Sequence, residues 1–124
     1  MAKTILIVED DNFLQGLEAK KLKNEGYDIL TAVNDAEAFK LINSRAQIDL
    51  ILLDLLLPEV DGFEILKKIR EGQVLPNVPV IVFSNLSEEK DIERIKKLGI
   101  SEFMVKSNFT LDELVKKVRD LIGK

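Results

Sequence analysis

Two stretches decide the fold of this chain: Ile5-Leu6-Ile7-Val8-Glu9-Asp10-Asp11 and Ile51-Leu52-Leu53-Asp54. Each is a short apolar run that ends in acidic residues. If both runs are neighbouring strands of a parallel sheet, their carboxylates converge at its C-terminal edge. Because several like charges packed together are costly, such a cluster needs a compensating cation. Ligands that are all oxygen suit a hard ion that keeps some of its waters, so the pattern predicts a Mg²⁺ site at this edge.

Five strand-like segments alternate with five helix-like segments along the chain. The first, third and fourth strand candidates are almost wholly apolar, which is typical of strands covered on both faces of a parallel sheet. This order predicts an α/β fold of the (βα)5 type, a doubly wound three-layer sandwich. The expected strands are Thr4–Val8, Asp28–Val33, Leu50–Leu53, Val80–Phe83 and Glu102–Val105, and the expected helices are Asn12–Glu25, Asn34–Asn43, Gly62–Arg70, Ser87–Leu98 and Thr110–Ile122.

Polar residues and glycines mark the ends of the expected helices. Asn34-x-x-Glu37 and Thr110-x-x-Glu113 have the spacing of a capping box. Ser87 is expected to cap the fourth helix. Gly26 is expected directly after the end of the first helix, where a residue with positive φ often stands. These signals agree with one helix in each crossover.

The composition predicts one globular domain and excludes several kinds of chemistry. The length of 124 residues fits a single domain. The sequence ends at Lys124, directly after the fifth expected helix, so we expect one domain over residues 1–124 and no output domain. Without cysteine or histidine, the chain has no thiol, disulfide, Ser-His or phosphohistidine chemistry of its own. The net charge of −4 argues against direct nucleic-acid binding. No apolar stretch reaches membrane-spanning length, and we expect no membrane association and a location in the cytoplasm.

Polar residues also follow the fourth and fifth expected strands. Ser84 follows the fourth expected strand and Lys106 follows the fifth. Ligands of doubly wound folds bind beyond the carboxyl ends of the strands, and carboxylates with a hydroxyl and an ammonium suit a metal ion and a phosphoryl group. Taken alone, a strand-end Asp is usually a turn or cap residue. Polar residues on successive strand ends favour a functional site instead.

Four motifs that together cover the chain indicate one family. They are Ile5–Asp11, Asp49–Gly62, Val78–Ser84 and Gly99–Lys106. Together they resemble the receiver domain of two-component response regulators, of the single-domain kind that resembles chemotaxis regulators. The resemblance implies a flavodoxin-like sandwich with the strand order 2-1-3-4-5.

The resemblance also implies roles for the acidic residues. Asp54 would be the phosphoacceptor, Asp10 would ligate Mg²⁺, and Glu9 would act through metal-bound water. Leu56, two residues past the acceptor, would offer its backbone carbonyl to the metal. Asp11 lies one step past the matched acidic pair and is expected to cap the following helix or to act as an outer carboxylate. Mg²⁺ at this place would cancel much of the repulsion between a carboxylate nucleophile and the phosphoryl oxygens.

The resemblance implies a switch at the other strand ends. The hydroxyl of Ser84 and the ammonium of Lys106 would bind the phosphoryl group, and the aromatic ring of Phe103 would swing into the space that Ser84 leaves. This would reshape the face formed by the fourth helix, the fifth strand and the fifth helix. An ordinary core aromatic is an equally good interpretation of Phe103.

Three positions depart from the pattern of the family. Leu56 and Asn85 would flank the phosphoryl group and modulate it, and Asn85 stands where a small residue is usual. Ser107 follows Lys106 where the family usually has a proline in a cis peptide. A cis bond before any other residue costs ~3 kcal/mol, so we expect the Lys106–Ser107 peptide to be trans. The change should be absorbed across Ser107–Phe109.

The implied function is a phosphorylation-dependent signalling switch. A histidine kinase or phosphotransfer protein would donate the phosphoryl group to Asp54 in a transfer that the receiver itself catalyses, and slow autodephosphorylation would end the signal. The chain would not be an enzyme acting on another substrate. A downstream protein would read the changed face, and the chain would be a monomer or a weak homodimer.

Three other classes of protein compete with this interpretation. A receiver fold could serve as a scaffold that is never phosphorylated, although such a scaffold has no need for the set Asp10, Asp54, Ser84 and Lys106. A flavodoxin-like nucleotide or flavin binder would need a phosphate loop where the acidic run begins at Glu9. An aspartyl phosphatase commonly has a second carboxylate where Leu56 stands.

Overall fold

The sheet of this protein has five parallel strands in the order β2-β1-β3-β4-β5, as expected. The computed structural model describes residues 2–44, 47–57, 61–86 and 88–123. The strand order reverses between β1 and β3, so these two strands flank the crevice in which doubly wound folds bind their ligands. The strands are β1 (Thr4–Val8), β2 (Asp28–Ala32), β3 (Leu50–Leu53), β4 (Val80–Ser84) and β5 (Glu102–Val105).

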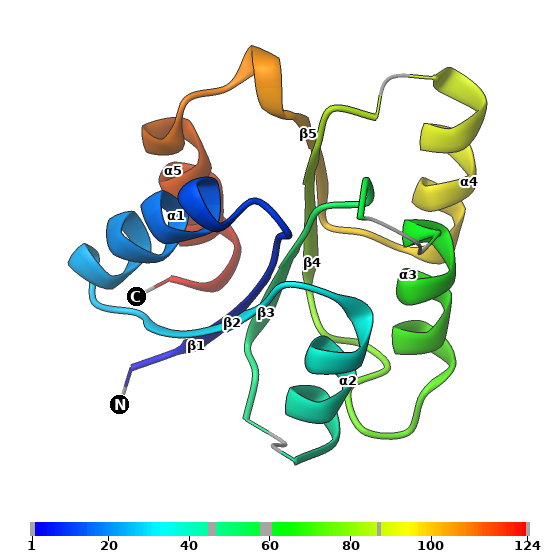
Figure 1. Ribbon diagram of the computed structural model, residues 1–124, viewed down its shortest axis with the longest axis horizontal. Helices are drawn as coiled ribbons and strands as arrows, with labels where there is room; N and C mark the ends of the chain where they lie inside the picture. Colours follow the sequence, from blue (N-terminus) through cyan, green and yellow to red (C-terminus); the bar gives the residue numbers. More distant parts are fainter. Residues whose placement is uncertain (1, 45–46, 58–60, 87, 124) are drawn as a thin grey trace.

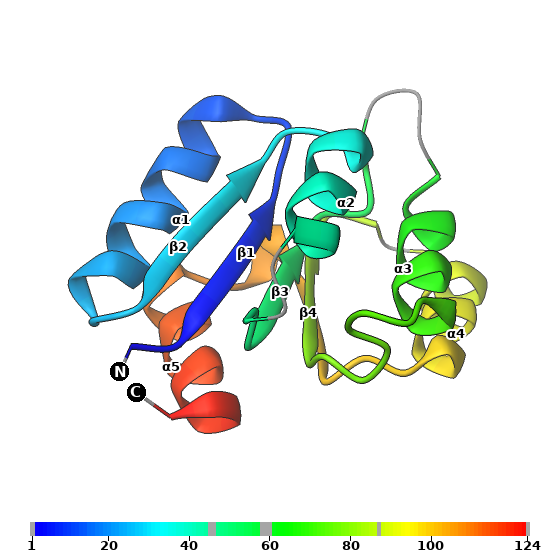
Figure 2. The same cartoon turned by 90° about the horizontal axis from the view of Figure 1, so that it is seen from below.

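Helices cover both faces of the sheet and complete a three-layer sandwich (Figures 1 and 2). Two helices, α1 and α5, lie on one face, and α2, α3 and α4 lie on the other. None of the helices in the described ranges is long and apolar enough to cross a membrane. Their bounds are α1 (Asn12–Asn24), α2 (Asp35–Ser44), α3 (Gly62–Glu71), α4 (Glu89–Leu98) and α5 (Leu111–Ile122), with a 3-10 turn, η1 (Lys106–Asn108), after β5.

Side-chain alternation along the strands divides the interior into two hydrophobic cores. Ile5 and Ile7 belong to the core under α1 and α5, whereas Leu6 and Val8 belong to the core under α2, α3 and α4. Successive side chains of a strand point to opposite faces, and here both faces are covered. This explains why β1, β3 and β4 are almost continuously apolar.

Most of the expected helix-end signals are confirmed. The Thr110 hydroxyl accepts a hydrogen bond from the Glu113 N–H at 3.1 Å, and the Glu113 carboxylate accepts one from the Thr110 N–H at 2.9 Å. Gly26, with a φ of 100°, follows the C-cap residue of α1. Ser87, the expected cap of α4, lies outside the described residues, and α4 itself starts at Glu89.

The bounds of the helices differ from the expected ones by one or two residues, and two strand ends and the cap of α2 also differ in detail. β2 ends at Ala32 rather than Val33, because its sole partner strand β1 ends opposite Ala32. β4 extends to Ser84, which pairs with β5. At the start of α2 the Asn34 side chain accepts from the Glu37 N–H at 2.8 Å, but the Glu37 carboxylate accepts from the Val33 N–H at 3.0 Å. One of the two hydrogen bonds of the predicted capping box is therefore present, and in the other the Glu37 carboxylate accepts from Val33 instead of Asn34.

The start of α3 packs directly against the segment that follows β3. A Cβ atom at Gly62 would lie 2.5 Å from the Leu55 Cα atom, closer than such atoms approach one another. Gly62 thus lets α3 begin beside the chain that carries Asp54. The Asp61 side chain caps this helix by accepting the Phe63 N–H at 2.9 Å.

Candidate functional site

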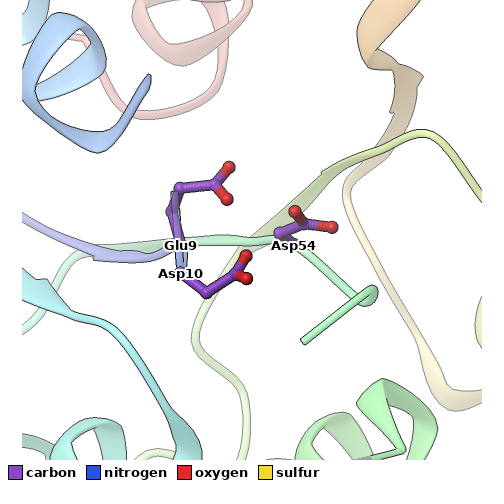
Figure 3. Close-up of side chains that lie close together, drawn as sticks. All are labelled: Glu9, Asp10 and Asp54. Carbon is purple, nitrogen blue, oxygen red and sulfur yellow. The ribbon is translucent and has the colours of Figure 1, made fainter. Parts of the chain in front are cut away.

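Three carboxyl groups meet beyond the ends of β1 and β3, as the sequence predicts (Figure 3). Carboxylate oxygens of Glu9, Asp10 and Asp54 lie within 4.8 Å of one another. The backbone holds these residues in place, because the Asp54 N–H donates to the Val8 carbonyl and the Glu9 N–H donates to the Ala32 carbonyl, each at 3.0 Å. These bonds continue the sheet one residue beyond the strand ends.

The alternation of the strands sends Glu9 and Asp10 to different sides. Glu9 continues the row of Ile5 and Ile7, on the face that α1 and α5 cover. Figure 3 shows the two side chains leaving the backbone on opposite sides, with both carboxyl groups on the side of Asp54. Glu9 is 1% exposed and Asp54 is 6% exposed, while Asp10 is half-buried. The site therefore combines two buried carboxylates with one that is accessible to solvent.

Lys106 links the two buried carboxylates. Its Nζ atom lies 2.5 Å from Glu9 Oε1 and 2.6 Å from Asp54 Oδ2. Lys106 directly follows β5, so one ammonium group connects the ends of three strands. Buried charges are tolerated when they are paired and hydrogen-bonded in this way. The ammonium group thus neutralises part, and only part, of the negative charge at this edge.

The pKa values of Glu9 and Lys106 are both raised, for different reasons. Burial raises the pKa of Glu9 to about 7; the hydrogen bond from Lys106 opposes this rise, and the charge of Asp54 adds to it. Burial acts to lower the pKa of Lys106, but the hydrogen bonds and charges of Asp54 and Glu9 outweigh it, and the net effect is a raised pKa. Lys106 is therefore charged at neutral pH, and the pKa of Glu9 lies near neutrality.

The donor set fits a hard divalent cation. Three carboxylates supply oxygen ligands alone, which is the chemistry that Mg²⁺ prefers. Asp54 Oδ1 accepts the Leu56 N–H at 3.0 Å, so the turn that carries Leu56 is already joined to Asp54. The Leu56 side chain is 51% exposed and stands beside this turn. The assignment of Leu56 as a backbone ligand stays a prediction.

Of the residues predicted to form the switch, Lys106 lies in the site, whereas Ser84 ends the neighbouring strand β4 and Phe103 lies within β5. Ser84 is fully buried, and its Oγ atom accepts the Leu86 N–H at 3.3 Å. Phe103 is half-buried against the core under α2, α3 and α4. The ring is neither fully exposed nor fully enclosed, so its role as a switch stays a prediction, as does that of Ser84.

Two of the positions that depart from the family pattern contact each other. The Ser107 N–H donates to the Asn85 side-chain oxygen at 3.1 Å. A proline in place of Ser107 would have no N–H to donate. The described residues contain no cis peptide, so the Lys106–Ser107 bond is trans as expected, and the chain turns through η1 immediately after β5. Asn85 is therefore engaged by the neighbouring loop.

Asp11 has the capping role that the sequence favours. Its Oδ1 atom accepts the Phe13 N–H at 3.0 Å and the Leu14 N–H at 3.1 Å. The Asp11 N–H donates to Glu9 Oε2 at 3.2 Å. Asp11 thus fixes the first turn of α1 next to the acidic cluster without belonging to it.

Sequence reasoning missed two residues of α1 beside this site. The Gln15 side-chain amide donates to the carbonyls of Glu9 and Ala32, at 2.9 and 3.0 Å, and so ties α1 to the ends of β1 and β2. Glu18 is 1% exposed. It stands between Leu14 and Leu22 at a spacing of four residues, so the periodicity of α1 was the signal that could have identified a buried carboxyl group.

Comparison with known proteins gives the same result as the geometry. A model of the response regulator receiver domain matches residues 5–119. The chain belongs to this family. Like the receivers of that family, it has the doubly wound fold and the acidic cluster at the end of β1 and β3.

Similar proteins agree with this assignment. The polar-differentiation response regulator DivK of Brucella anthropi is 29% identical over 123 residues, which are 99% of this chain and 98% of DivK. The probable transcriptional regulator ycf29 of Porphyra purpurea is 32% identical over 122 residues, which are 98% of this chain and 57% of ycf29. The chain spans about half the length of most curated relatives that it matches. The chemotaxis protein CheY4 of Vibrio cholerae, at 22% identity, shares the fold with a TM-score of 0.88 over 98% of this chain and 99% of that one.

The chain is therefore a receiver domain of a two-component response regulator, which is consistent with phosphorylation-dependent signalling. A receiver domain implies a kinase or phosphotransfer protein as one partner and a downstream target as another. Family membership argues against the flavodoxin-like nucleotide binder and the aspartyl phosphatase. It leaves the scaffold that is never phosphorylated to an experiment.

Proposed function

We propose that this receiver domain is a signalling switch that accepts a phosphoryl group on Asp54. The observation that carries the proposal is the double ion pair of Lys106, which joins the buried carboxylates of Asp54 and Glu9 at distances of 2.6 and 2.5 Å. A scaffold would not need two buried carboxylates held by one ammonium group, because charged groups are costly to bury. Phosphotransfer needs both the nucleophile and the cation in this arrangement.

Asp54 would act as the nucleophile. One of its oxygens attacks the phosphorus atom, the new O–P bond forms, and the bond between phosphorus and the histidine nitrogen of the donor breaks, with its electron pair leaving on that nitrogen. A carboxylate has no proton to lose in this step, so no general base is needed. The Leu56 N–H holds Oδ1 and restricts the rotation of the carboxylate before attack.

Lys106 would follow the charge during the transfer. In the resting site its ammonium group binds Asp54 Oδ2. As this carboxylate becomes an acyl phosphate, the negative charge moves outward to the phosphoryl oxygens, and Lys106 can move with it while Glu9 remains beside it. A donor aimed at developing charge stabilises the transition state more than the ground state.

Mg²⁺ fits the same edge of the sheet. Asp10, Asp54 and the backbone oxygen of Leu56 would hold it directly, and Glu9 would hold it through water. When bound, it supplies the positive charge that neutralises the repulsion between the carboxylates and the phosphoryl oxygens. The proximity of the three carboxylates supports this assignment.

The signal would leave the site through Ser84 and Phe103. Ser84 would exchange the Leu86 N–H for a phosphoryl oxygen, and Phe103 would follow into the space, which changes the face made by α4, β5 and α5. We propose that a downstream protein binds this face.

We further propose that the side chains of Leu56 and Asn85 modulate the slow autodephosphorylation. The protein would work in the cytoplasm as a monomer or weak homodimer, without direct contact to nucleic acid.

Phosphorylation by a small donor tests the proposal. The protein is incubated with phosphoramidate or acetyl phosphate and Mg²⁺, and its intact mass is measured. We expect one labile phosphoryl group on the native chain, none on Asp54→Ala, and one on the control Asp120→Ala, which removes an exposed aspartate of α5. A native chain that remains unmodified in Mg²⁺ would support the scaffold instead.

A further inference from the structure

Glu18 is a buried carboxyl group that the proposed phosphotransfer does not yet use. It lies in α1 and is 1% exposed. Its Oε1 atom has no hydrogen-bond partner. Among the described residues, every other buried side-chain oxygen or nitrogen has one. Burying a polar group without a partner costs free energy, and burying an unpaired charge costs more. An apolar residue at this position would avoid that cost, so the carboxyl group requires an explanation.

Glu18 faces the same side of the sheet as the charged residues of the site. The rows of side chains under α1 and α5 run through Leu52 on β3 and Met104 on β5. Two residues further along their strands these rows reach Asp54 and Lys106, just as the row of β1 reaches Glu9. Helical side chains lean toward the N-terminus of their helix, and the N-terminus of α1 adjoins the acidic cluster. The carboxyl group of Glu18 therefore leans from α1 toward the site.

The surrounding charges keep this carboxyl group neutral in the resting protein. The pKa of Glu18 is raised to about 8, mainly by burial and next by the negative charge of Glu9. The positive charge of Lys106 acts in the opposite direction, while Asp54 and Asp11 again raise the pKa. Glu18 thus responds to the balance of charge at the end of the sheet.

Two ion pairs join charged side chains of α1 and α5 near the surface. Lys21 of α1 lies 2.6 Å from Asp112 of α5, and Arg119 of α5 pairs with Glu25 beyond the end of α1. These side chains are exposed or partly exposed. The site residues are therefore the charges that act on Glu18 from within the fold.

Occupation of the site would reverse the balance of charge. Lys106 is neutralised in the resting structure by Glu9 and Asp54, and these are the same carboxylates that Mg²⁺ and the phosphoryl group engage. A divalent cation adds two positive charges to a region in which Lys106 is already positive. This added positive charge favours loss of the proton from Glu18, which places a buried negative charge on the same side of the sheet.

We propose that Glu18 is a positioning residue for the phosphotransfer reaction: its carboxyl group is neutral in the resting site and loses its proton when Mg²⁺ binds, so that it becomes the buried counter-charge of Lys106. The proton passes to the solvent, and no other bond changes. The proposal rests on the proposed function, because it takes the acidic cluster to be the metal site. Because Glu18 loses a proton when Mg²⁺ binds, the affinity of the protein for Mg²⁺ should increase with pH over the range in which Glu18 titrates.

Counting protons tests the proposal. Mg²⁺ is titrated calorimetrically into the full chain at pH 7.5 in two buffers of different ionisation enthalpy, and the difference in heat gives the number of protons released. Glu18→Gln keeps the shape and polarity of the side chain but cannot release a proton. Glu71→Gln, which changes an exposed glutamate of α3, is the matched control.

We expect Glu18→Gln to release clearly fewer protons than the native chain, and Glu71→Gln to release the same number. Between pH 7 and pH 9 the affinity of the native chain for Mg²⁺ should rise several-fold relative to that of Glu18→Gln. Equal proton release by the native chain and Glu18→Gln would overturn the proposal. A native chain that does not bind Mg²⁺ at all would instead refute the proposed function.

A measurement on the native chain guards against a variant that folds poorly. The ¹³C resonance of the Glu18 carboxyl group is followed as a function of pH by NMR, with and without Mg²⁺. We expect the midpoint of its titration to fall when Mg²⁺ is present. A midpoint that Mg²⁺ leaves unchanged would also overturn the proposal.

Discussion

The two faces of the sheet differ in what they bury, although the same five strands supply both. On the face under α2, α3 and α4 the described interior is an apolar core bordered by the Ser84 hydroxyl at the end of β4, and Asp10 joins the site from the end of the β1 row. On the face under α1 and α5 the rows end in Glu9, Asp54 and Lys106, and α1 adds the buried Glu18. Buried charges contribute little to stability even when they are paired. The first face therefore mainly holds the fold, and the second mainly carries the chemistry.

The largest expected effect comes from the apolar face. Leu66 of α3 is fully buried in the core under α2, α3 and α4. Leu66→Ala should lower the free energy of unfolding by about 2–5 kcal/mol, because it removes buried methyl groups and leaves a cavity. Leu121→Ala, at a leucine of α5 that is 41% exposed, is the control and should cost much less. Urea unfolding measures both, and similar losses would contradict the contrast between core and surface.

On the charged face, a substitution should stabilise the protein. Because the pKa of Glu18 is raised, the folded protein binds a proton that the unfolded chain has lost, and stability falls as pH rises from about 5 to about 8. Glu18→Leu removes this loss. Relative to the native chain it should gain stability with rising pH, by on the order of 3 kcal/mol at pH 8 since each pKa unit corresponds to about 1.4 kcal/mol. Urea unfolding at pH 5 and pH 8 checks this, and a gain that is independent of pH would contradict the burial of an ionisable group.

Mg²⁺ should stabilise the native protein through the acidic cluster at the strand ends. A ligand that binds only the folded state adds about 2.7 kcal/mol at a concentration 100 times its Kd. Asp54→Asn should reduce this stabilisation because it removes one carboxylate of the cluster, whereas Leu66→Ala should keep the Mg²⁺ effect although it lowers overall stability. Thermal melting with and without Mg²⁺ measures the difference. A melting temperature of the native chain that is indifferent to Mg²⁺ would contradict the metal site.

The smallest effect is expected at the rim of the site. The hydrogen bond between the Ser107 N–H and the Asn85 side chain is exposed, so Asn85→Ala should cost about 1 kcal/mol or less. Ser107→Pro removes the donor of the same bond. Either substitution removes the same hydrogen bond. The double variant should therefore lose less free energy of unfolding, measured in urea, than the two single variants lose together. Strictly additive costs would mean that the bond does not couple the two loops.

The sequence was sufficient to predict the layers of the fold and the meeting of the strand-end residues. Apolar runs placed the strands, and cap residues such as Thr110 placed the helices. The strand order that the family resemblance implied placed Glu9 next to Asp54. The strands and helices follow from short-range patterns, and the position of the site follows from a rule that holds for all doubly wound sheets.

What the sequence did not predict depends on contacts between distant residues. The bond between Asn85 and Ser107 joins two loops 22 residues apart, and neither residue alone indicates the other. The burial of Glu18 could have been inferred from the stripe of Leu14 and Leu22, but its lack of a partner follows only from the packed structure. The roles of Ser84 and Phe103 concern a second conformation, so one structure does not test them.

The most direct test of the central claim is to identify the residue that carries the phosphoryl group. After treatment with phosphoramidate and Mg²⁺, the protein is reduced with borohydride, which converts an aspartyl phosphate to homoserine, and the peptides are analysed by mass spectrometry. The account predicts homoserine in place of Asp54, dependent on the donor and on Mg²⁺. Modification at any other residue, or a phosphoryl group that survives acid and resists reduction, would contradict it.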